Sequence, residues 1–366
     1  MSYFQQMLKS IESEPDLSHR AMGALTTLLR QVPAIELKDI ELDKRLGNRE
    51  VDLLAHISVS GHPHALVCEI KSNGQPRYVR LALLQLRSVL DRFEEDATPL
   101  LIAPYLSPEA QAMCRDEGIG FLDLEGNTRL AFDGVFIERQ VAGKPAATRR
   151  EIKSLFKPKS AQVLRILLQD PKRAWRITEL AQAADVSVGH VSNVRVALLD
   201  REWARIAPNG LSLSNPDALL DAWRAAYEPP QGERHNLYTT LHGTAFDEAL
   251  RKVLGSANAD GNAMFSSFSA ARWLAPYART GSQFLYADRT GLNKLRDVLK
   301  LSTPIKGENV VVTRLDDRGL FRDAVQPAPG IVCTSPTQTY LDLSLAGERG
   351  REAADHLRRE VLQWSP

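Results

Sequence analysis

The stretches REVDLL at Arg49–Leu54 and EIK at Glu69–Lys71 decide the fold of the first third of this chain. An acidic residue at the start of one apolar run, followed by Glu-x-Lys in the next, is typical of a divalent-metal nuclease centre. Residues two apart project from the same face of a strand, so Glu69 and Lys71 share a face. We predict that Asp52 lies opposite this pair.

The elements around these stretches follow the order α-β-β-β-α-β. Apolar runs rich in β-branched residues predict strands, and apolar residues at helical spacing predict helices. Gly61-His62-Pro63 is typical of the turn that joins the second and third strands. The predicted elements are a helix at Asp16–Gln31, strands at about 34–42, 50–59 and 65–72, a helix from Arg77 to about Glu94, and a strand at Pro99–Ala103.

The chemistry of a Mg²⁺ site suits these residues. Mg²⁺ prefers oxygen ligands and takes one or two protein carboxylates, so Asp52, Glu69 and the backbone carbonyl of Ile70 are the predicted metal ligands. The metal would polarise a phosphodiester and lower the pKa of a bound water. Lys71 would orient that water or neutralise charge that develops on phosphate. The alternative is that Glu69 and Lys71 are solvated residues on the open face of a hairpin.

This element order, with Asp52, Glu69 and Lys71 at its strand positions, resembles the restriction-endonuclease-like PD-(D/E)xK superfamily. The resemblance covers about residues 10–140 and implies an α/β domain with a mixed sheet. Val51 stands where the namesake motif has proline. Gln85, fourteen residues beyond Lys71, resembles a further catalytic Gln of some branches; the alternative is an ordinary polar helix residue. Many members of this superfamily have lost catalysis.

The overall composition is that of an ordinary globular protein. The chain has 366 residues, 43% hydrophobic and 25% charged, which predicts two or three domains. The net charge of +1 gives no global attraction to nucleic acid, so any basic patch must be local. The three cysteines are far apart, and neither a signal peptide nor a membrane span is evident. We therefore expect a reduced, cytoplasmic protein without a membrane partner.

A basic segment follows the first domain. Residues 139–159 hold seven Lys or Arg side chains and one acid, and we assign 141–159 as a basic linker. The simplest interpretation is a solvated linker. The alternative is a strap that contacts DNA phosphates through Arg149, Arg150 and Lys153, because basic residues displace counterions along DNA.

Residues 160–228 predict a winged helix-turn-helix domain. Amphipathic Ser160–Gln169, a helix at Thr178–Ala184, a short turn and a third helix from Ser187 are followed by two short strands around Pro208-Asn209-Gly210. This order of three helices and a hairpin resembles the winged-helix family and implies binding to double-stranded DNA.

The third helix of this domain carries the predicted base-reading residues. Val188, Val191, Val194 and Leu198 are expected to pack inward. The expected outward-facing, DNA-binding side chains are His190, Ser192, Asn193 and Arg195, which can reach bases or phosphates. The alternative is that this helix serves a protein interface. Residues 160–227 are nearly neutral, so the basic linker or a homodimer would have to supply further phosphate contacts.

The last domain, 234–366, is expected to be α+β. Its segments Ser266–Leu274 (SSFSAARWL), Ser335–Leu343 (SPTQTYLDL) and Gly347–Ala354 (GERGREAA) resemble sequences of the AbiEi-type antitoxins. That resemblance implies a winged-helix transcriptional regulator of its own operon. It also implies an antitoxin in a type IV toxin-antitoxin system, whose partner is a nucleotidyltransferase-like toxin.

Three acidic residues of this last domain are not assigned to chemistry. Asp316, Asp317 and Asp342 are interpreted as turn and cap residues.

Two functions therefore compete. In the first, the chain is a DNA-binding regulator and antitoxin, and its nuclease-like domain is a scaffold or DNA clamp. In the second, it is a Mg²⁺-dependent endonuclease of the restriction or genome-defence type, which its winged helix directs to DNA. The C-terminal segments favour the first, and the set of Asp52, Glu69 and Lys71 favours the second.

Overall fold

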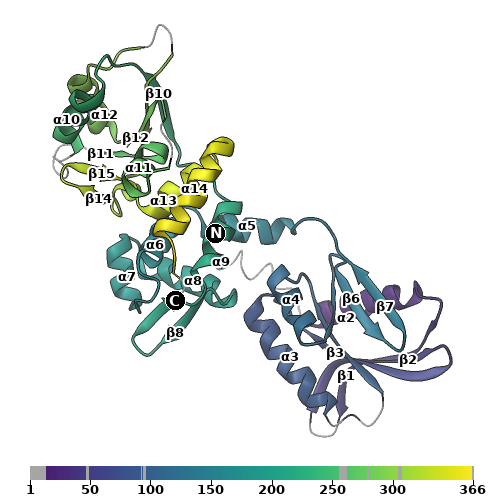
Figure 1. The fold of residues 1–366 in the computed structure, drawn as a ribbon. Helices are drawn as coiled ribbons and strands as arrows, with labels where there is room; N and C mark the ends of the chain where they lie inside the picture. Colours follow the sequence, from purple (N-terminus) through teal and green to yellow (C-terminus); the bar gives the residue numbers. More distant parts are fainter. Residues whose placement is uncertain are drawn as a thin grey trace. The chain divides into compact units, whose positions relative to one another are not determined.

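The computed structural model describes residues 14–46, 49–91, 93, 96–254, 262–277, 280–303 and 307–364. The chain divides into two units (Figure 1). The N-terminal unit comprises residues 1–149 with 199–202, and the C-terminal unit comprises 150–198 with 203–366. Each is a mixture of helices and strands, as expected from the sequence.

The N-terminal unit is built on one seven-stranded sheet in which the strands follow one another in chain order. The pairs at both ends of the sheet are antiparallel, and β3, β4 and β5 run parallel at its centre. Its elements are α2 (Glu14–Arg30), β1 (Ile35–Leu46), β2 (Arg49–Val59), β3 (His62–Ile70), α3 (Pro76–Leu90), β4 (Ala97–Ala103), α4 (Pro108–Asp116), β5 (Gly120–Asp123), β6 (Thr128–Phe132) and β7 (Val135–Arg139).

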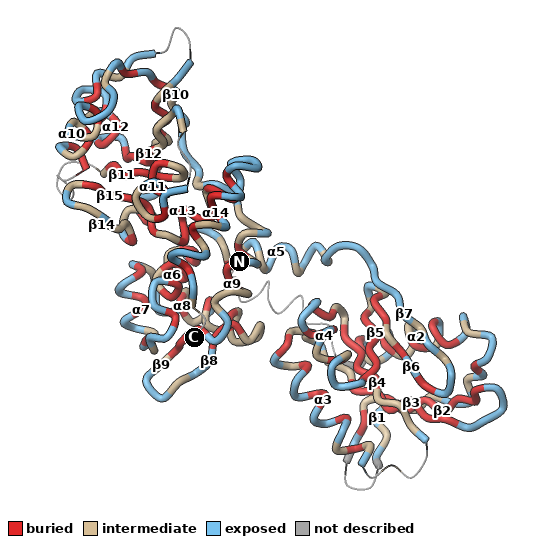
Figure 2. Tube along the Cα trace, viewed as in Figure 1, coloured by how far each residue is buried: buried red, intermediate tan, exposed pale blue. Residues whose placement is uncertain are grey.

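Helices cover both faces of this sheet. On one face, α2 packs Leu25 and its neighbours against Leu53 and Leu66 of β2 and β3. On the other, α3 and α4 pack Val79 and Leu86 against the remaining apolar side chains of the sheet. The central strands are accordingly buried over most of their length, β5 throughout, β3 from His64 to Glu69 and β4 from Leu100 to Ala103 (Figure 2), because a parallel sheet with helices on both sides has no solvated face.

The turn between β2 and β3 is shorter than the sequence indicated. We expected Gly61-His62-Pro63 to form it, but His62 already pairs with Val59, so only Ser60 and Gly61 connect the strands. Both turn residues have positive φ, 48° for Ser60 and 93° for Gly61. A two-residue hairpin turn needs such values, because they match the right-handed twist of the two strands that it joins. The prediction therefore erred because it placed the turn on the proline.

A buried carboxylate stabilises the loop between β5 and β6. Asp123 is 1% exposed and accepts hydrogen bonds from the backbone N–H groups of Leu106, Glu125 and Asn127 and from the Asn127 side chain, at 2.8–3.2 Å. These bonds satisfy donors that the loop buries away from other partners.

The C-terminal unit contains a helix–hairpin module followed by a second sheet. The module comprises α5 (Ala146–Leu155, which begins within the first unit), α6 (Pro158–Gln169), α7 (Ile177–Ala184), α8 (Val188–Asp200, whose last two residues belong to the first unit), β8 (Ala204–Ala207), β9 (Gly210–Leu213) and α9 (Pro216–Ala225). The expected linker at 141–159 is therefore largely helical, and α6 begins two residues before the predicted Ser160, because Pro158 can occupy the first turn of a helix.

The second sheet has six strands in the order β10-β13-β12-β11-β15-β14, with parallel and antiparallel pairs. Its elements are β10 (Gly232–Leu237), α10 (Gly243–Leu254), β11 (Ala263–Phe265), α11 (Ser267–Leu274), β12 (Gln283–Ala287), α12 (Arg289–Leu299), β13 (Val310–Leu315), η1 (Arg318–Phe321), β14 (Val325–Ala328), β15 (Ile331–Cys333), α13 (Pro336–Ser344) and α14 (Gly347–Val361).

Buried polar contacts join the helix–hairpin module to this sheet module. The Arg165 guanidinium on α6 donates to Asp323 at 2.8 Å, and both side chains are almost fully buried. Asp342 on α13 accepts hydrogen bonds from Tyr227 at 2.5 Å and Gln338 at 2.9 Å. Burial raises the pKa of Asp342 to about 6.

The expectation for the three acidic residues of the last domain is thus only partly met. Asp317 caps η1 by accepting from Gly319 N. Asp342, which was interpreted as a turn or cap residue, is instead a buried acceptor within a helix.

We predict that Asp123→Ala lowers the free energy of unfolding of the N-terminal unit by roughly 3 kcal/mol, because it leaves several buried N–H groups without an acceptor. Asp116→Ala, at the exposed end of α4, should change it by less than about 0.5 kcal/mol. Urea unfolding of the two variants measures the difference. Equal stability of Asp123→Ala and the wild type would show that the loop is held by other contacts.

Candidate metal centre and nucleic-acid interface

The β2–β3 hairpin brings the predicted acidic residues together. Leu53 pairs with Cys68, so the same antiparallel register sets Asp52 beside Glu69. The backbone N–H of Ile70 donates to the Asp52 carboxylate at 2.6 Å. The negative charge of Asp52 also acts on the pKa of Glu69. The backbone N–H of Ile70 thus contacts Asp52, while the predicted role of the Ile70 carbonyl as a metal ligand stays a prediction.

Glu69 and Lys71 form a half-shielded ion pair. The Glu69 side chain is 8% exposed and that of Lys71 26%, and the Lys71 ammonium donates to Glu69 Oε1. Burial raises the pKa of Glu69 and so does Asp52, while Lys71 opposes both. Desolvation is the largest of these effects, because burial disfavours the charged form of a carboxyl group.

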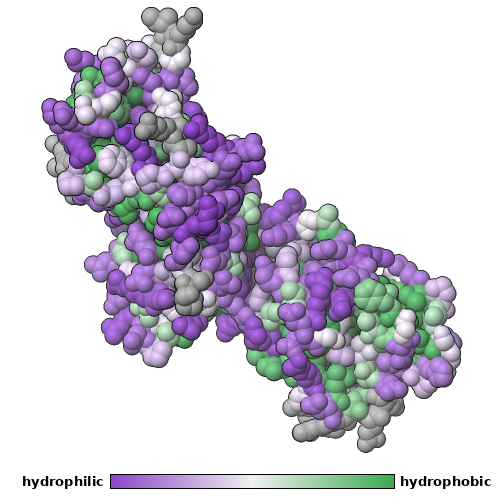
Figure 3. Space-filling view, viewed as in Figure 1, coloured by the Kyte–Doolittle hydropathy of each residue, from purple (hydrophilic) through white to green (hydrophobic). Residues whose placement is uncertain are grey.

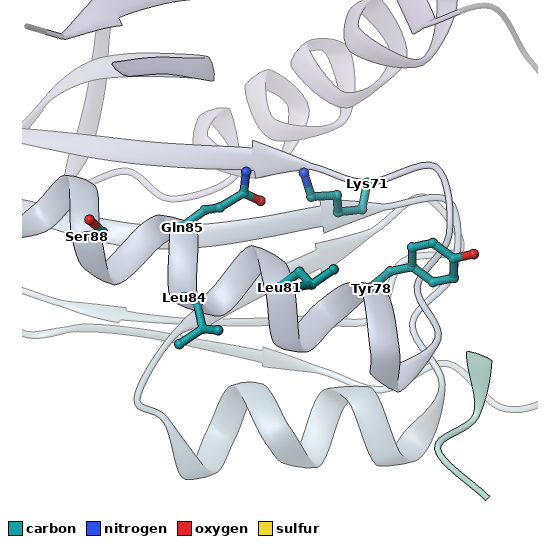
Figure 4. Close-up of a pocket in the computed structure, with 6 residues that line it drawn as sticks. All are labelled: Lys71, Tyr78, Leu81, Leu84, Gln85 and Ser88. Carbon is teal, nitrogen blue, oxygen red and sulfur yellow. The ribbon is translucent and has the colours of Figure 1, made fainter. Parts of the chain in front are cut away.

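Gln85 lies near Lys71, on the exposed side of α3. A cavity of about 590 Å³ is lined by Lys71, Tyr78, Leu81, Leu84, Gln85 and Ser88. Figure 4 shows the Lys71 amine and the Gln85 amide pointing toward each other. The structure therefore brings Gln85 beside Lys71, and Lys71 joins this cavity to the two carboxylates.

The walls of this cavity include apolar side chains that water reaches. Leu81 and Leu84 are 56% and 60% exposed, and hydrophobic patches are visible among the polar surface of this unit (Figure 3). Neither leucine was predicted from the sequence as a site residue, although their three-residue spacing on α3 could have identified them.

The oxygen atoms at this position suit a hard divalent cation, but they are few. Asp52 and Glu69 supply two carboxylates, and Glu69 already engages Lys71. Across the residues that the structure describes, no group of three or more His, Cys, Asp and Glu side chains could hold a metal ion. Solvent and a phosphate group would therefore have to complete the coordination of Mg²⁺.

The helix–hairpin module has the order predicted from the sequence. Asp185, with φ of 51°, ends α7, and the Ser187 hydroxyl accepts from His190 N at the start of α8. Val191, Val194 and Leu198 are buried as expected. Val188 was expected to pack inward but is 48% exposed. It is the first residue of α8 and precedes the buried row of Val191, Val194 and Leu198.

The four predicted reading residues have different environments. Asn193 is exposed. The Ser192 hydroxyl donates to Val188 O within the helix. His190 does not point freely outward, since its Nε2 lies 3.1 Å from the Ser160 hydroxyl of α6, and burial lowers its pKa. Arg195 is half-buried, with an Nε atom that has no hydrogen-bond partner among the described residues.

Exposed cations that were not predicted from the sequence as site residues lie around the hairpin. Lys172, Arg173, Arg176 and Arg205 are all exposed. The Arg173 guanidinium stacks on the Trp175 ring, 3.6 Å from its centroid. Trp175 bridges to Leu211 of β9, while Arg205 lies on β8. The run KRAWR, just before α7, is the feature of the sequence that could have identified these cations.

The predicted phosphate strap lies on α5. Arg149, Arg150 and Lys153 are exposed on this helix, and Lys153 pairs with Glu228 at 2.6 Å. An exposed ion pair of this kind contributes little to stability, so Lys153 could exchange Glu228 for a phosphate.

One family model matches the C-terminal part of the chain. Residues 212–363 match the family described as "Transcriptional regulator, AbiEi antitoxin, Type IV TA system". A search of curated proteins finds no match. No helix among the described residues has both the length and the apolar character to cross a membrane.

Solved structures similar to part of the chain include a repair endonuclease from Pyrococcus abyssi and EndoMS bound to double-stranded DNA. They share 19% and 20% sequence identity, cover 28% and 30% of this chain, and have a TM-score of 0.22 each. The chain spans 46% of the length of either one. A likeness at this level does not establish a shared fold or activity.

We predict that the N-terminal unit binds Mn²⁺, used here as a probe for Mg²⁺, and that Glu69→Gln weakens this binding. Metal binding needs the ionised carboxylate. Because the pKa of Glu69 is raised, the affinity should increase as pH rises above the ordinary range of a glutamate and then level off. Isothermal titration calorimetry at several pH values measures this effect.

The matched control for this titration is Glu109→Gln, which changes an exposed carboxylate on α4. It should bind Mn²⁺ as the wild type does. Equal affinity of Glu69→Gln and the wild type at every pH would exclude Glu69 as a ligand.

Proposed function

We propose that this protein is a DNA-binding transcriptional regulator and the antitoxin of a type IV toxin-antitoxin system. The match of residues 212–363 to the antitoxin family is the observation that carries the proposal. In this role the chain would bind DNA near its own gene and would also bind a nucleotidyltransferase-like toxin. The three helices and hairpin between α6 and β9 would be its winged helix-turn-helix domain.

The exposed face of α8 supports a role in reading bases. Asn193 can form paired hydrogen bonds with an adenine edge. Gly189 is exposed and lacks a side chain, so it would permit close approach to the DNA. The exposed valines Val188 and Val196 could contact thymine methyl groups. This face carries little charge, so it would contribute specificity more than affinity.

Phosphate contacts would come from other elements. The cations around the hairpin (Lys172, Arg173, Arg176 and Arg205) stand on the same module as α8, and α5 adds Arg149, Arg150 and Lys153. Phosphate contacts fix the orientation of a protein on DNA without reading its sequence. We therefore assign affinity to the hairpin and α5, and base reading to Asn193.

A salt-titrated binding assay on the DNA upstream of the gene tests this division. Asn193→Ala should weaken specific binding by roughly 1–3 kcal/mol and relax the preference at one base position. The double change Arg176→Gln and Arg205→Gln should weaken binding to all sequences. It should also reduce the slope of log affinity against log salt by about 1.8, that is about 0.9 for each lost phosphate contact.

The triple neutralisation of Arg149, Arg150 and Lys153 should act in the same direction as the double change. The exposed Gln169→Ala, at the end of α6, is the matched control and should leave both quantities unchanged. If Asn193→Ala and Arg195→Ala both bind the upstream DNA as tightly as the wild type, α8 serves a protein interface instead.

The second candidate function is a Mg²⁺-dependent DNA endonuclease. The observation that favours it is the proximity of Asp52, Glu69, Lys71 and Gln85 at one end of the first sheet. In that reaction Asp52 and Glu69 would hold Mg²⁺, which would activate a water molecule, and Lys71 would stabilise charge on the phosphate. Without such activity, the N-terminal unit would be a scaffold or DNA clamp.

Cleavage of double-stranded DNA distinguishes the two candidates. If the endonuclease is active, Asp52→Ala should abolish Mg²⁺-dependent cleavage and leave DNA binding by the helix–hairpin module intact. Cleavage that persists in Asp52→Ala, or in excess chelator, would come from a contaminant. An absence of cleavage by the wild type with Mg²⁺ or Mn²⁺ would leave the regulator as the better account.

A further inference from the structure

A second cavity, of about 550 Å³, lies within the C-terminal unit. Its walls come from the helix–hairpin module through α6 and α9, and from the sheet module through α13 and the connection between β13 and η1. Cavities of roughly 300–1,000 Å³ are those in which proteins bind small molecules. Neither the antitoxin family nor the proposed function assigns a role to it.

Aromatic rings form part of the wall. Phe156 and Trp223 stack on each other with their planes 3° apart and their centroids 5.5 Å apart. Tyr227 also lines the cavity. Flat rings of this kind favour a ligand that is itself flat, because offset stacking adds to the burial of apolar area.

Two polar side chains in the wall have unused hydrogen-bonding capacity. Gln338 is 2% exposed; its Nε2 donates to Tyr227 at 2.7 Å and to Asp342 at 2.9 Å, which uses both N–H groups. Its Oε1 accepts no hydrogen bond from the described residues. Arg165 donates through Nε to Asp323 and through Nη2 to the Gly319 carbonyl. Its Nη1 has no acceptor among the residues that the structure describes. The wall thus offers one acceptor, Gln338 Oε1, and one donor, Arg165 Nη1, to a molecule in the cavity.

Gln162 adds a third polar group, which a glycine helps to position. Its amide makes no hydrogen bond with the described residues, although it lines the cavity. A Cβ atom on Gly319 would lie 1.6 Å from Gln162 Nε2, so the amide packs directly against the backbone of η1. The wall therefore offers donors from Arg165, an acceptor from Gln338, and both from Gln162.

The charges around the cavity balance. Its lining contains Lys153, Lys157 and Arg165 as cations, against three acids, Glu228, Asp316 and Asp317. A polyanion would gain no net attraction from this set. A neutral ligand with several donors and acceptors would meet the unpaired groups without bringing an uncompensated charge into a buried site.

We propose that this cavity binds a planar, neutral nitrogen heterocycle of the nucleobase or nucleoside class. The ring system would lie against Phe156, which stacks on the buried Trp223, while its edge would donate to Gln338 Oε1 and accept from Arg165 Nη1. Gln162 would distinguish between bases, because an amide can pair with a donor–acceptor edge. The proposal goes beyond DNA binding and toxin binding and does not depend on either.

The position of the cavity gives binding a mechanical consequence. The ligand would contact α6 of the helix–hairpin module and α13 of the sheet module at once. It would therefore stabilise the packing of these two modules, and a ligand that binds only the folded state raises the melting temperature.

The test uses the full chain with adenosine, guanosine, cytidine and uridine as probes, by thermal shift and isothermal titration calorimetry without DNA. At least one nucleoside should raise the melting temperature and bind saturably. Gln162→Leu should weaken that binding about tenfold, as expected for lost hydrogen bonds in a buried site. This variant should fold normally, because Gln162 makes no hydrogen bond with the rest of the described chain.

Gln169→Leu, on the exposed end of the same helix, is the matched control and should bind as the wild type does. Phe156→Leu is a second variant, which removes one ring from the wall and should also weaken binding. The proposal is overturned if no nucleoside raises the melting temperature, or if Gln162→Leu and Phe156→Leu both bind as tightly as the wild type. Because DNA is absent, failure here is distinct from failure of the proposed regulator.

Discussion

The register of the β2–β3 hairpin is the constraint on which the N-terminal unit depends. The two positive-φ residues of its turn, Ser60 and Gly61, set the pairing of Leu53 with Cys68. A slip by one residue would turn every side chain of a strand to the opposite face. Asp52 and Glu69 would then separate, and the apolar residues that pack under α2 would face α3. One short turn therefore determines both the core and the candidate metal centre.

Charge in the helix–hairpin module is divided between elements. The exposed face of α8 holds Asn193, glycine and valines, while cations stand on the hairpin and on α5. A protein that neutralises phosphates with residues distinct from its base-reading residues can change specificity and affinity separately. In the proposed DNA-binding role, this division would let a chain of net charge +1 attract phosphates, because the local field matters more than the total charge.

Helix α6 is shared by two modules of the C-terminal unit. Its Arg165 forms a buried ion pair with Asp323, and removing one partner would leave an uncompensated charge in a place that water does not reach. Asp342 accepts from Tyr227 on one side and from Gln338 on the other. The second cavity lies among these contacts, so a ligand there, or a partner that distorts the sheet module, would act directly on a helix of the proposed DNA-binding domain.

Local patterns in the sequence were sufficient to predict the strands around Asp52 and Glu69, the order of helices from α6 to α8, and the buried row of Val191, Val194 and Leu198. They were sufficient because the periodicity of apolar residues shows which face of an element is buried. The antitoxin-like segments near the C-terminus were likewise recognisable, and a family match covers that region. Tertiary structure alone decided the pairing of Arg165 with Asp323, the contact of His190 with Ser160, and the second cavity. Each depends on residues brought together from separate elements, and spacing along a chain carries no information about that approach.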